Sequence, residues 1–501
     1  MRENDLMFSS DPTTAMSWGR WSTHAPDSFE PEPAGPSCYD VSRRNRGGLF
    51  RLYPFFTIAL TLSIGLLLCT EVSPALSVST FSASNKVLQG SRKSQVSTTD
   101  RIAALEALLV RNPSDGNEWL NLGSAYLRRA FETGDPAQYP LAQRSLLRAV
   151  QLLGTSPDVL SAQTTLALAR HQFVDAQTLS TQLLKQRPLS VEGRIARFDA
   201  IVELGKYDQA LALIEELVDQ RASLSTMARL SYIKQLLGDS TGSEMAMRAA
   251  VGAAPKDSFD RGVALGYLGD VLMENGKLAS ASVAYRSALN VAPSLPNALL
   301  GEARVSMARG DPIEAQRNID RLIERIPTPG GLGFRADIAR SLGDTQAAVS
   351  ANQLVDASVQ LFRANGSVVD AELAVLLADR GPSGAKQAYE TAKRAYQERQ
   401  TIFTSDALAW SLFVSGRLSE AAFYAKQAIR TDPVVSSVRW HAAAIFAAAG
   451  EVQLARRELK AAARNSWFSP SQRPALLALA KKLGVAIPST SLQSATNKET
   501  S

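Results

Sequence analysis

The amino-acid sequence predicts an all-α fold in which about ten helix pairs stack into a solenoid behind one membrane-spanning helix. Three observations support this prediction. Alanine and leucine are abundant, and runs in which β-branched and polar residues strictly alternate are rare, which favours helices over strands. A pattern of small residues, glycine and proline returns about every 34 residues. An uncharged apolar stretch precedes the first repeat.

The N-terminal segment, residues 1–48, is rich in proline, serine, glycine and charged residues and has no periodic apolar pattern. Because such a composition buries little apolar surface, we predict that this segment is disordered. Residues 72–100 are rich in serine and threonine and are predicted to be a flexible stalk. Residues 487–501 are predicted to be a disordered tail.

Residues 49–71 are predicted to form a transmembrane helix. Residues 52–70 carry no charge, and at about 1.5 Å per residue these 19 positions nearly span the roughly 30 Å core of a bilayer. The flanking charges are positive before the stretch and negative after it, at Arg43, Arg44, Arg46, Arg51 and Glu71. By the positive-inside rule, the N-terminus is cytoplasmic and the repeats are extracytoplasmic. A cleaved signal peptide, a lipoprotein signal ending at Cys69 and a buried core helix are the alternatives.

A small residue marks the same position in ten successive units, at Ala142, Ala176, Ala210, Ser243, Ala281, Ala315, Ala348, Ala388, Ala421 and Ala455. Glycine recurs a few places earlier, at Gly205, Gly238, Gly276, Gly310, Gly343, Gly416 and Gly450. Proline closes several units, at Pro157, Pro188, Pro255, Pro293, Pro327 and Pro433. Each unit is too short to bury its own apolar face, so neighbouring units must cover one another.

The stretch LGYLGDVLMENGKLASASVAYRSALNVAP, residues 265–293, gives the physical reason for each residue type. Gly269 lies on the apolar face of a first helix and leaves room for a close approach. Gly276 can adopt the left-handed conformation that ends this helix. Ala281 lets the second helix come near, and Tyr285 continues the same face. Pro293 stops the second helix because it lacks an N–H donor.

The first helix of the first unit, NEWLNLGSAYL, carries W-x2-L-G-x2-Y at Trp119, Leu122, Gly123 and Tyr126. Second helices carry A-x3-aromatic or A-x3-A followed by proline, as at Ala281, Tyr285, Ala288 and Pro293. This pattern resembles the tetratricopeptide repeat family, and the resemblance covers residues 101–467. It implies an α-solenoid with a concave groove that binds protein partners. Residues 468–486 are predicted to form the capping helix that the end of a solenoid requires.

The resemblance also implies which side chains face the groove, because first helices line it in tetratricopeptide arrays. The predicted partner-binding positions are Asp270, Met273, Arg304, Met307, Phe403, Asp406, Trp410, Phe413 and Trp440. Aromatic and methionine side chains contribute much of the binding energy at protein interfaces. Trp410 and Phe413 have an equally good explanation as packing between neighbouring helices.

Candidate chemistry is sparse. The histidines are His24, His171 and His441, and the cysteines Cys38 and Cys69 leave residues 70–501 without a thiol. No HExxH, CxxC, GxSxG or GxxxxGK[ST] motif is present. GGLGFRAD, from Gly330, follows a proline-rich stretch rather than a strand, so we expect an inter-repeat turn rather than a phosphate-binding loop. No nucleophile or carboxylate stands out as a partner of His441, and we predict no enzyme activity, no cofactor and no metal site.

The charges argue against nucleic acid as a partner. The formal net charge of +6 is small for 501 residues, and both signs are mixed along the repeats. The sequence therefore predicts a membrane-anchored scaffold that binds protein partners through its groove and organises a complex at the cell envelope. The alternative is an accessory protein that binds a glycan or export substrate, with Phe403, Trp410 and Trp440 stacking on sugar rings.

Overall fold

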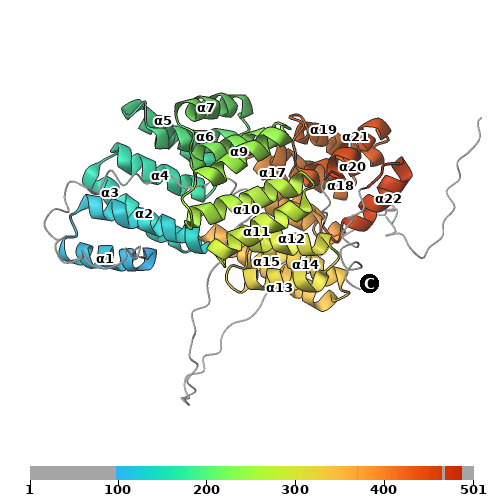
Figure 1. Ribbon diagram of the computed structural model, residues 1–501, viewed down its shortest axis with the longest axis horizontal. Helices are drawn as coiled ribbons and strands as arrows, with labels where there is room; N and C mark the ends of the chain where they lie inside the picture. The colour runs from blue at the N-terminus through green and yellow to red at the C-terminus, as the bar shows by residue number, and fades with distance from the viewer. Residues whose placement is uncertain (1–96, 369, 465–468, 488–501) are drawn as a thin grey trace, which may run out of the picture. The chain divides into compact units, whose positions relative to one another are not determined.

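The computed structural model describes residues 97–368, 370–464 and 469–487. These residues form 22 α-helices and no strand, which confirms the all-α prediction for this part of the chain (Figure 1). A short 3-10 helix, Gly381–Ser383, is the other regular element among them. The first and last helices lie outside the pairs and are α1 (Thr98–Arg111) and α22 (Arg473–Leu483).

The twenty helices between them form ten consecutive pairs, and the two helices of each pair pack against one another. The pairs are α2 (Gly116–Thr133) with α3 (Gln138–Leu153), α4 (Pro157–Ala169) with α5 (Phe173–Gln186), α6 (Val191–Glu203) with α7 (Tyr207–Gln220), α8 (Leu224–Leu236) with α9 (Ser240–Ala253), α10 (Phe259–Glu274) with α11 (Leu278–Val291), α12 (Pro296–Ala308) with α13 (Pro312–Ile323), α14 (Pro329–Ser341) with α15 (Thr345–Ala364), α16 (Asp370–Ala378) with α17 (Ala385–Glu398), α18 (Ile402–Val414) with α19 (Leu418–Ala428), and α20 (Ser436–Ala448) with α21 (Val452–Ala462).

Several predicted segments lie outside the described residues. These are the disordered segment 1–48, the transmembrane helix 49–71, most of the stalk 72–100 and most of the tail 487–501. None of the helices that the structure does describe combines the length and the apolar character needed to cross a bilayer. The predicted boundary between stalk and solenoid differs slightly from the structure, because Ser97 caps α1 and its side chain accepts a hydrogen bond from the Asp100 amide.

The pair α10 and α11 shows why the repeat needs its small residues. Tyr285 is fully buried, and an ideal Cβ added at Gly269 or at Gly301 would lie within 2.4 Å of its ring. The two glycines therefore form the slot that holds this ring between α10 and α12. Gly276 ends α10 with a φ of 72°, the left-handed conformation that the sequence predicts there.

The expectation of a turn at GGLGFRAD is wrong, because this stretch opens helix α14. Thr328 caps the helix by accepting a hydrogen bond from the Gly331 amide, and Pro329 occupies its first turn. A Cβ at Gly333 would lie 2.6 Å from Leu376 of α16. Gly333 therefore lies inside a helix, where it leaves room for the Leu376 side chain of the neighbouring first helix.

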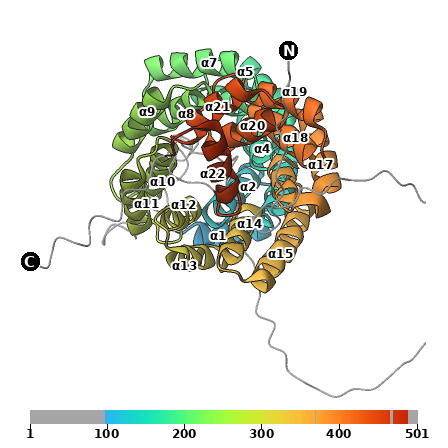
Figure 2. The ribbon, with the colours of Figure 1, turned by 90° about the vertical axis from the view of Figure 1, so that its right-hand side faces the viewer.

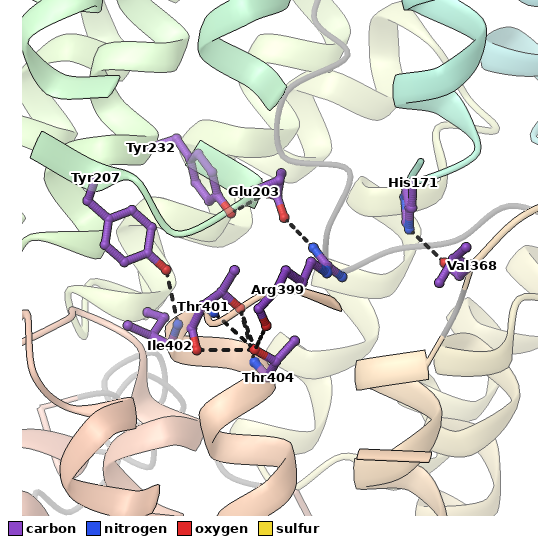
Figure 3. A network of polar contacts seen from close by, with 9 residues as sticks. All are labelled: His171, Glu203, Tyr207, Tyr232, Val368, Arg399, Thr401, Ile402 and Thr404. Carbon is purple, nitrogen blue, oxygen red and sulfur yellow. Dashed lines mark hydrogen bonds and ion pairs between the residues drawn. The ribbon is translucent and has the colours of Figure 1, made fainter. Parts of the chain in front are cut away.

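Later helix pairs contact earlier ones about six pairs away in the sequence, and the pairs follow one another around a ring in Figure 2. His171 lies against Val368, with its Nδ1 3.0 Å from the Val368 carbonyl oxygen (Figure 3). The Ile402 amide donates to the Tyr207 hydroxyl over 3.0 Å. The solenoid thus completes one superhelical turn in about six pairs, and its next turn lies against the first.

A buried ion pair reinforces this contact between turns. Arg399 Nη1 lies 2.8 Å from Glu203 Oε2, and the side chains are only 11% and 10% exposed. The Tyr232 hydroxyl donates to the other Glu203 oxygen over 3.0 Å (Figure 3). The Arg399 guanidinium also lies 4.7 Å from the centre of the Phe173 ring. Burial raises the pKa of Glu203, and Arg399 opposes that rise.

The repeat glycines have a second use where the turns touch. A Cβ at Gly205, Gly238 or Gly276 would lie 2.7, 2.5 or 2.2 Å from a backbone carbonyl oxygen of the next superhelical turn. The equivalent Gly416 and Gly450 have a positive φ as well, but nothing lies within 4 Å of their added Cβ. The glycine at this repeat position therefore ends a helix in each of these units. Only in the middle units does it also leave room for the backbone of the next superhelical turn.

Candidate functional site

A cavity of about 1660 Å³ lies inside the solenoid. Its wall is built mainly from the first helix of each pair, with contributions from α2, α4, α8, α10, α12, α14, α16, α18 and α20. The volume exceeds the roughly 300–1,000 Å³ that is usual for a small-molecule site. The cavity is therefore the candidate binding site, and its size suits a segment of polypeptide.

The structure places most of the predicted groove residues on this wall. Those that line the cavity are Asp270, Met273, Arg304, Phe403, Asp406 and Trp440. Met307 packs against the core beneath α12, and Trp410 is 9% exposed. The Trp410 ring stacks on Phe413 and on His441, with centroids 5.1 and 4.2 Å apart. Packing is thus the better explanation of Trp410 and Phe413, while binding at the other positions stays a prediction.

His441, on α20, lies at the centre of a polar cluster whose other members come from neighbouring elements. Its Nδ1 is 3.0 Å from both carboxylate oxygens of Asp406, and its Nε2 is 3.4 Å from the Gln472 amide nitrogen. The Trp410 indole donates to Asp379 over 2.9 Å, and Gln472 donates to the same oxygen over 3.2 Å. Burial alone would lower the pKa of His441, but the Asp406 carboxylate raises it above the usual value.

This cluster is not arranged for nucleophilic catalysis. A histidine paired with a carboxylate needs a hydroxyl or thiol at its second nitrogen, whereas the Nε2 of His441 faces the Gln472 amide. Within the residues that the structure describes, no three His, Cys, Asp or Glu side chains could hold a metal ion together. The hydrogen bonds of the cluster join α18, α20 and α22 to Asp379, just after α16.

A second polar cluster joins α10, α11, α12 and α16. The Tyr285 hydroxyl donates to Asp270 over 2.7 Å, and Arg304 acts electrostatically on both Asp270 and Glu372. Burial raises the pKa of Asp270 to about 6 and that of Glu372 to about 8. Glu372 as a whole is half-buried, but its Oε1 is cut off from solvent and has no hydrogen-bond partner. The desolvation cost therefore falls on the carboxylate itself.

The N-terminal part of the cavity has a different charge arrangement. Arg187 binds Asp158 with both terminal nitrogens, at 2.6 and 3.2 Å. Arg128 Nε lies 2.7 Å from Glu132 Oε1, and Arg128 Nη2 lies 3.7 Å from Asp260 Oδ1. Here arginines pair with Asp158, Glu132 and Asp260. In the C-terminal part Arg340 pairs with Asp337, whereas neutral donors hold Asp270 and Asp379.

Four members of these clusters are not among the site residues that the sequence predicts: Glu372, Asp379, Gln472, and His441 as the partner of Asp406. Two spacings in the sequence point to these contacts. Asp406 and His441 are 35 positions apart and lie on first helices of consecutive units. Glu372 and Asp379 are seven positions apart, the spacing of one helix face. Gln472 follows the last repeat, and no pattern in the sequence places it at the wall.

Residues 407–470 match the sequence model of the tetratricopeptide repeat family, and a comparison with curated protein sequences returned no match. Three solved structures are similar at low identity. A tetratricopeptide repeat protein from Parabacteroides merdae is 19% identical and covers 54% of this chain and 98% of its own, with a TM-score of 0.29. The human IFIT1 dimer with m7Gppp-AAAA is 13% identical, covering 66% and 76%, with a TM-score of 0.41. Yeast Tom70 is 12% identical, covering 77% and 92%, with a TM-score of 0.33. At these TM-scores the likenesses carry no conclusion about function, and the match to residues 407–470 makes the last two helix pairs similar to tetratricopeptide repeats.

Proposed function

We propose that this protein is a non-enzymatic helical-repeat scaffold that holds a segment of a protein partner inside its cavity and organises a complex at the cell envelope. The observation that carries the proposal is the cavity of about 1660 Å³, built from successive first helices. Half-buried aromatic side chains on the wall, such as Phe403, offer surface that a partner can cover, and aromatic contacts of this kind dominate binding at protein interfaces.

The membrane tether is part of the proposal and rests on the sequence alone. Residues 52–70 have the length and apolar character of a single span, and the arginines before them favour an extracytoplasmic array. A tether would raise the local concentration of the array around partners in or near the same membrane. The glycan alternative has less support, because Trp410 packs on His441 and does not line the cavity.

Site-specific photo-crosslinking in cells tests the scaffold function. A benzophenone amino acid is placed at Tyr267 or Phe403, which line the cavity, and in matched controls at Val174 or Met245, which are 60% and 67% exposed and lie outside it. We expect a defined partner to be captured from the cavity positions and not from the controls. Capture from the outer positions alone, or from none, would contradict the proposal.

A further inference from the structure

We propose that the acidic wall of the cavity, defined as Asp270, Glu372, Asp379 and Asp406, binds the basic side chains of an extended peptide segment. This inference rests on the proposed scaffold function and gives the chemical class of the segment that the cavity holds. The occupant is a stretch of a partner protein that carries lysine or arginine, bound without folding inside the cavity.

The four wall carboxylates have few cations near them. Within the described residues, no lysine or arginine forms an ion pair with any of these four carboxylates. Tyr285 donates to Asp270, Trp410 and Gln472 donate to Asp379, and His441 contacts Asp406. Arg304 acts electrostatically on Asp270 and Glu372, and His441 pairs with Asp406 and acts on Asp379. A buried carboxylate gains most from a cation that arrives with its own hydrogen bonds, so the wall favours an ammonium or guanidinium group.

The indole of Trp440 supports the inference independently of the acids. Trp440 lies on the cavity wall and is 3% exposed, yet its Nε1 has no hydrogen-bond partner. Buried indole N–H groups usually have a partner, and an unsatisfied donor costs free energy. A backbone carbonyl of a bound peptide is the simplest acceptor for it, since every residue of a peptide supplies one.

The spacing of two wall acids matches that of side chains in an extended peptide. Glu372 and Asp379 are seven positions apart on α16 and just after it, which corresponds to about 10 Å along a helix axis. In an extended polyproline-type peptide, side chains three residues apart point the same way and are separated by about 9 Å. Two basic residues three positions apart would therefore reach both carboxylates, with one extended peptide running along α16.

Fluorescence anisotropy of the full-length protein with a labelled peptide tests the inference. The probe is a ten-residue peptide of alanine, serine and proline that carries two arginines three residues apart, and its control carries two glutamines instead. We expect the arginine peptide to bind at least tenfold more tightly than the glutamine peptide. The double variant Glu372→Gln with Asp379→Asn should lose at least tenfold in affinity for the arginine peptide.

A matched control separates the wall from general electrostatics. Glu314→Gln with Glu420→Gln makes the matching two acid-to-amide changes on exposed side chains of α13 and α19 and should change the affinity less than twofold. Trp440→Phe keeps an aromatic side chain of smaller size, removes the unsatisfied donor and should weaken binding about threefold to tenfold. It keeps the test decisive if the double variant fails to fold, as judged by circular dichroism.

Equal losses in the wall and control variants would overturn the inference, as would equal binding of the arginine and glutamine peptides. The crosslinking experiment distinguishes this failure from failure of the scaffold function. If Tyr267 or Phe403 captures a partner whose crosslinked segment lacks lysine and arginine, the scaffold function stands and the basic-peptide inference fails. If neither position captures a partner, the scaffold function itself fails.

Discussion

Replacing Gly238 with alanine should weaken the contact between successive superhelical turns more than it weakens the helix pair that contains it. Gly238 has a φ of 84°, and its Cβ would lie 2.5 Å from the Asp432 carbonyl oxygen. Gly450 is the matched control, because its φ is 80° and nothing lies within 4 Å of its Cβ. Both substitutions place a side chain in a left-handed conformation, at a cost of about 1–2 kcal/mol. Only Gly238→Ala adds an overlap with backbone, which typically costs about 1–3 kcal/mol.

Hydrogen exchange measures this difference locally, which matters because long repeat arrays do not unfold in two states. The Val434 amide donates to the Gln235 carbonyl over 2.8 Å and therefore reports on the contact between the turns. With about 1.4 kcal/mol for each factor of ten, its exchange should rise about fivefold to a hundredfold in Gly238→Ala. It should be unchanged in Gly450→Ala. The same rate at Val434 in both variants would refute the role of Gly238 in the contact.

Three further predictions concern buried polar groups. Arg399→Met leaves Glu203 buried without its cation and should lower the stability of the contact between the turns by about 3–5 kcal/mol. The exposed Arg317→Met should lower it by about 1 kcal/mol or less. Hydrogen exchange at the contact measures both, and similar effects of the two variants would contradict the prediction. The raised pKa of Glu372, about 8 against an ordinary 4.5, contributes stability that is complete below pH 4.5 and lost as the pH rises through 8. Glu372→Gln should therefore become progressively more stable than the parent between these values in thermal melts, and a constant difference would show that Glu372 titrates normally. Tyr285→Phe removes the donor to Asp270 and should lower local stability by about 1–3 kcal/mol, as measured by hydrogen exchange of the amides of α10 and α11, whereas unchanged exchange would mean that this hydrogen bond contributes nothing.

Most of the local architecture was predictable because it depends on neighbours in the sequence. The positive φ of Gly276 and the close approach at Gly269 follow from residues within one unit. Among the described residues, the ten helix pairs follow from the periodic small residues. The glycines of GGLGFRAD do not distinguish a turn from a helix, because glycine serves equally in a turn and in a close contact between helices such as that of Gly333 with Leu376.

The contacts between superhelical turns were not predictable. Glu203 and Arg399 are 196 positions apart, and their encounter depends on the small rotation between one pair and the next, summed over about six pairs. A slight change in that rotation would place Arg399 beside a different unit. The charge of the wall was unpredictable for a similar reason. Whether a cation lies near Glu372 depends on side chains of other units, such as Arg304 of α12. The sequence of a single unit does not contain that information.

The contact between turns leaves two routes by which a peptide can enter the cavity: the turns separate, or the peptide threads from an open end. If entry requires the turns to separate, Arg399→Met should raise both the association and the dissociation rate of the arginine peptide, because the variant weakens the closed state without touching the wall. The equilibrium affinity would then change little, since rates in both directions share the same opened state. If the peptide instead threads from an open end, both rates should match those of the control Arg317→Met. Stopped-flow anisotropy distinguishes the two routes, and a change in the dissociation rate alone would contradict both, because it would mean that Arg399 stabilises the bound peptide itself.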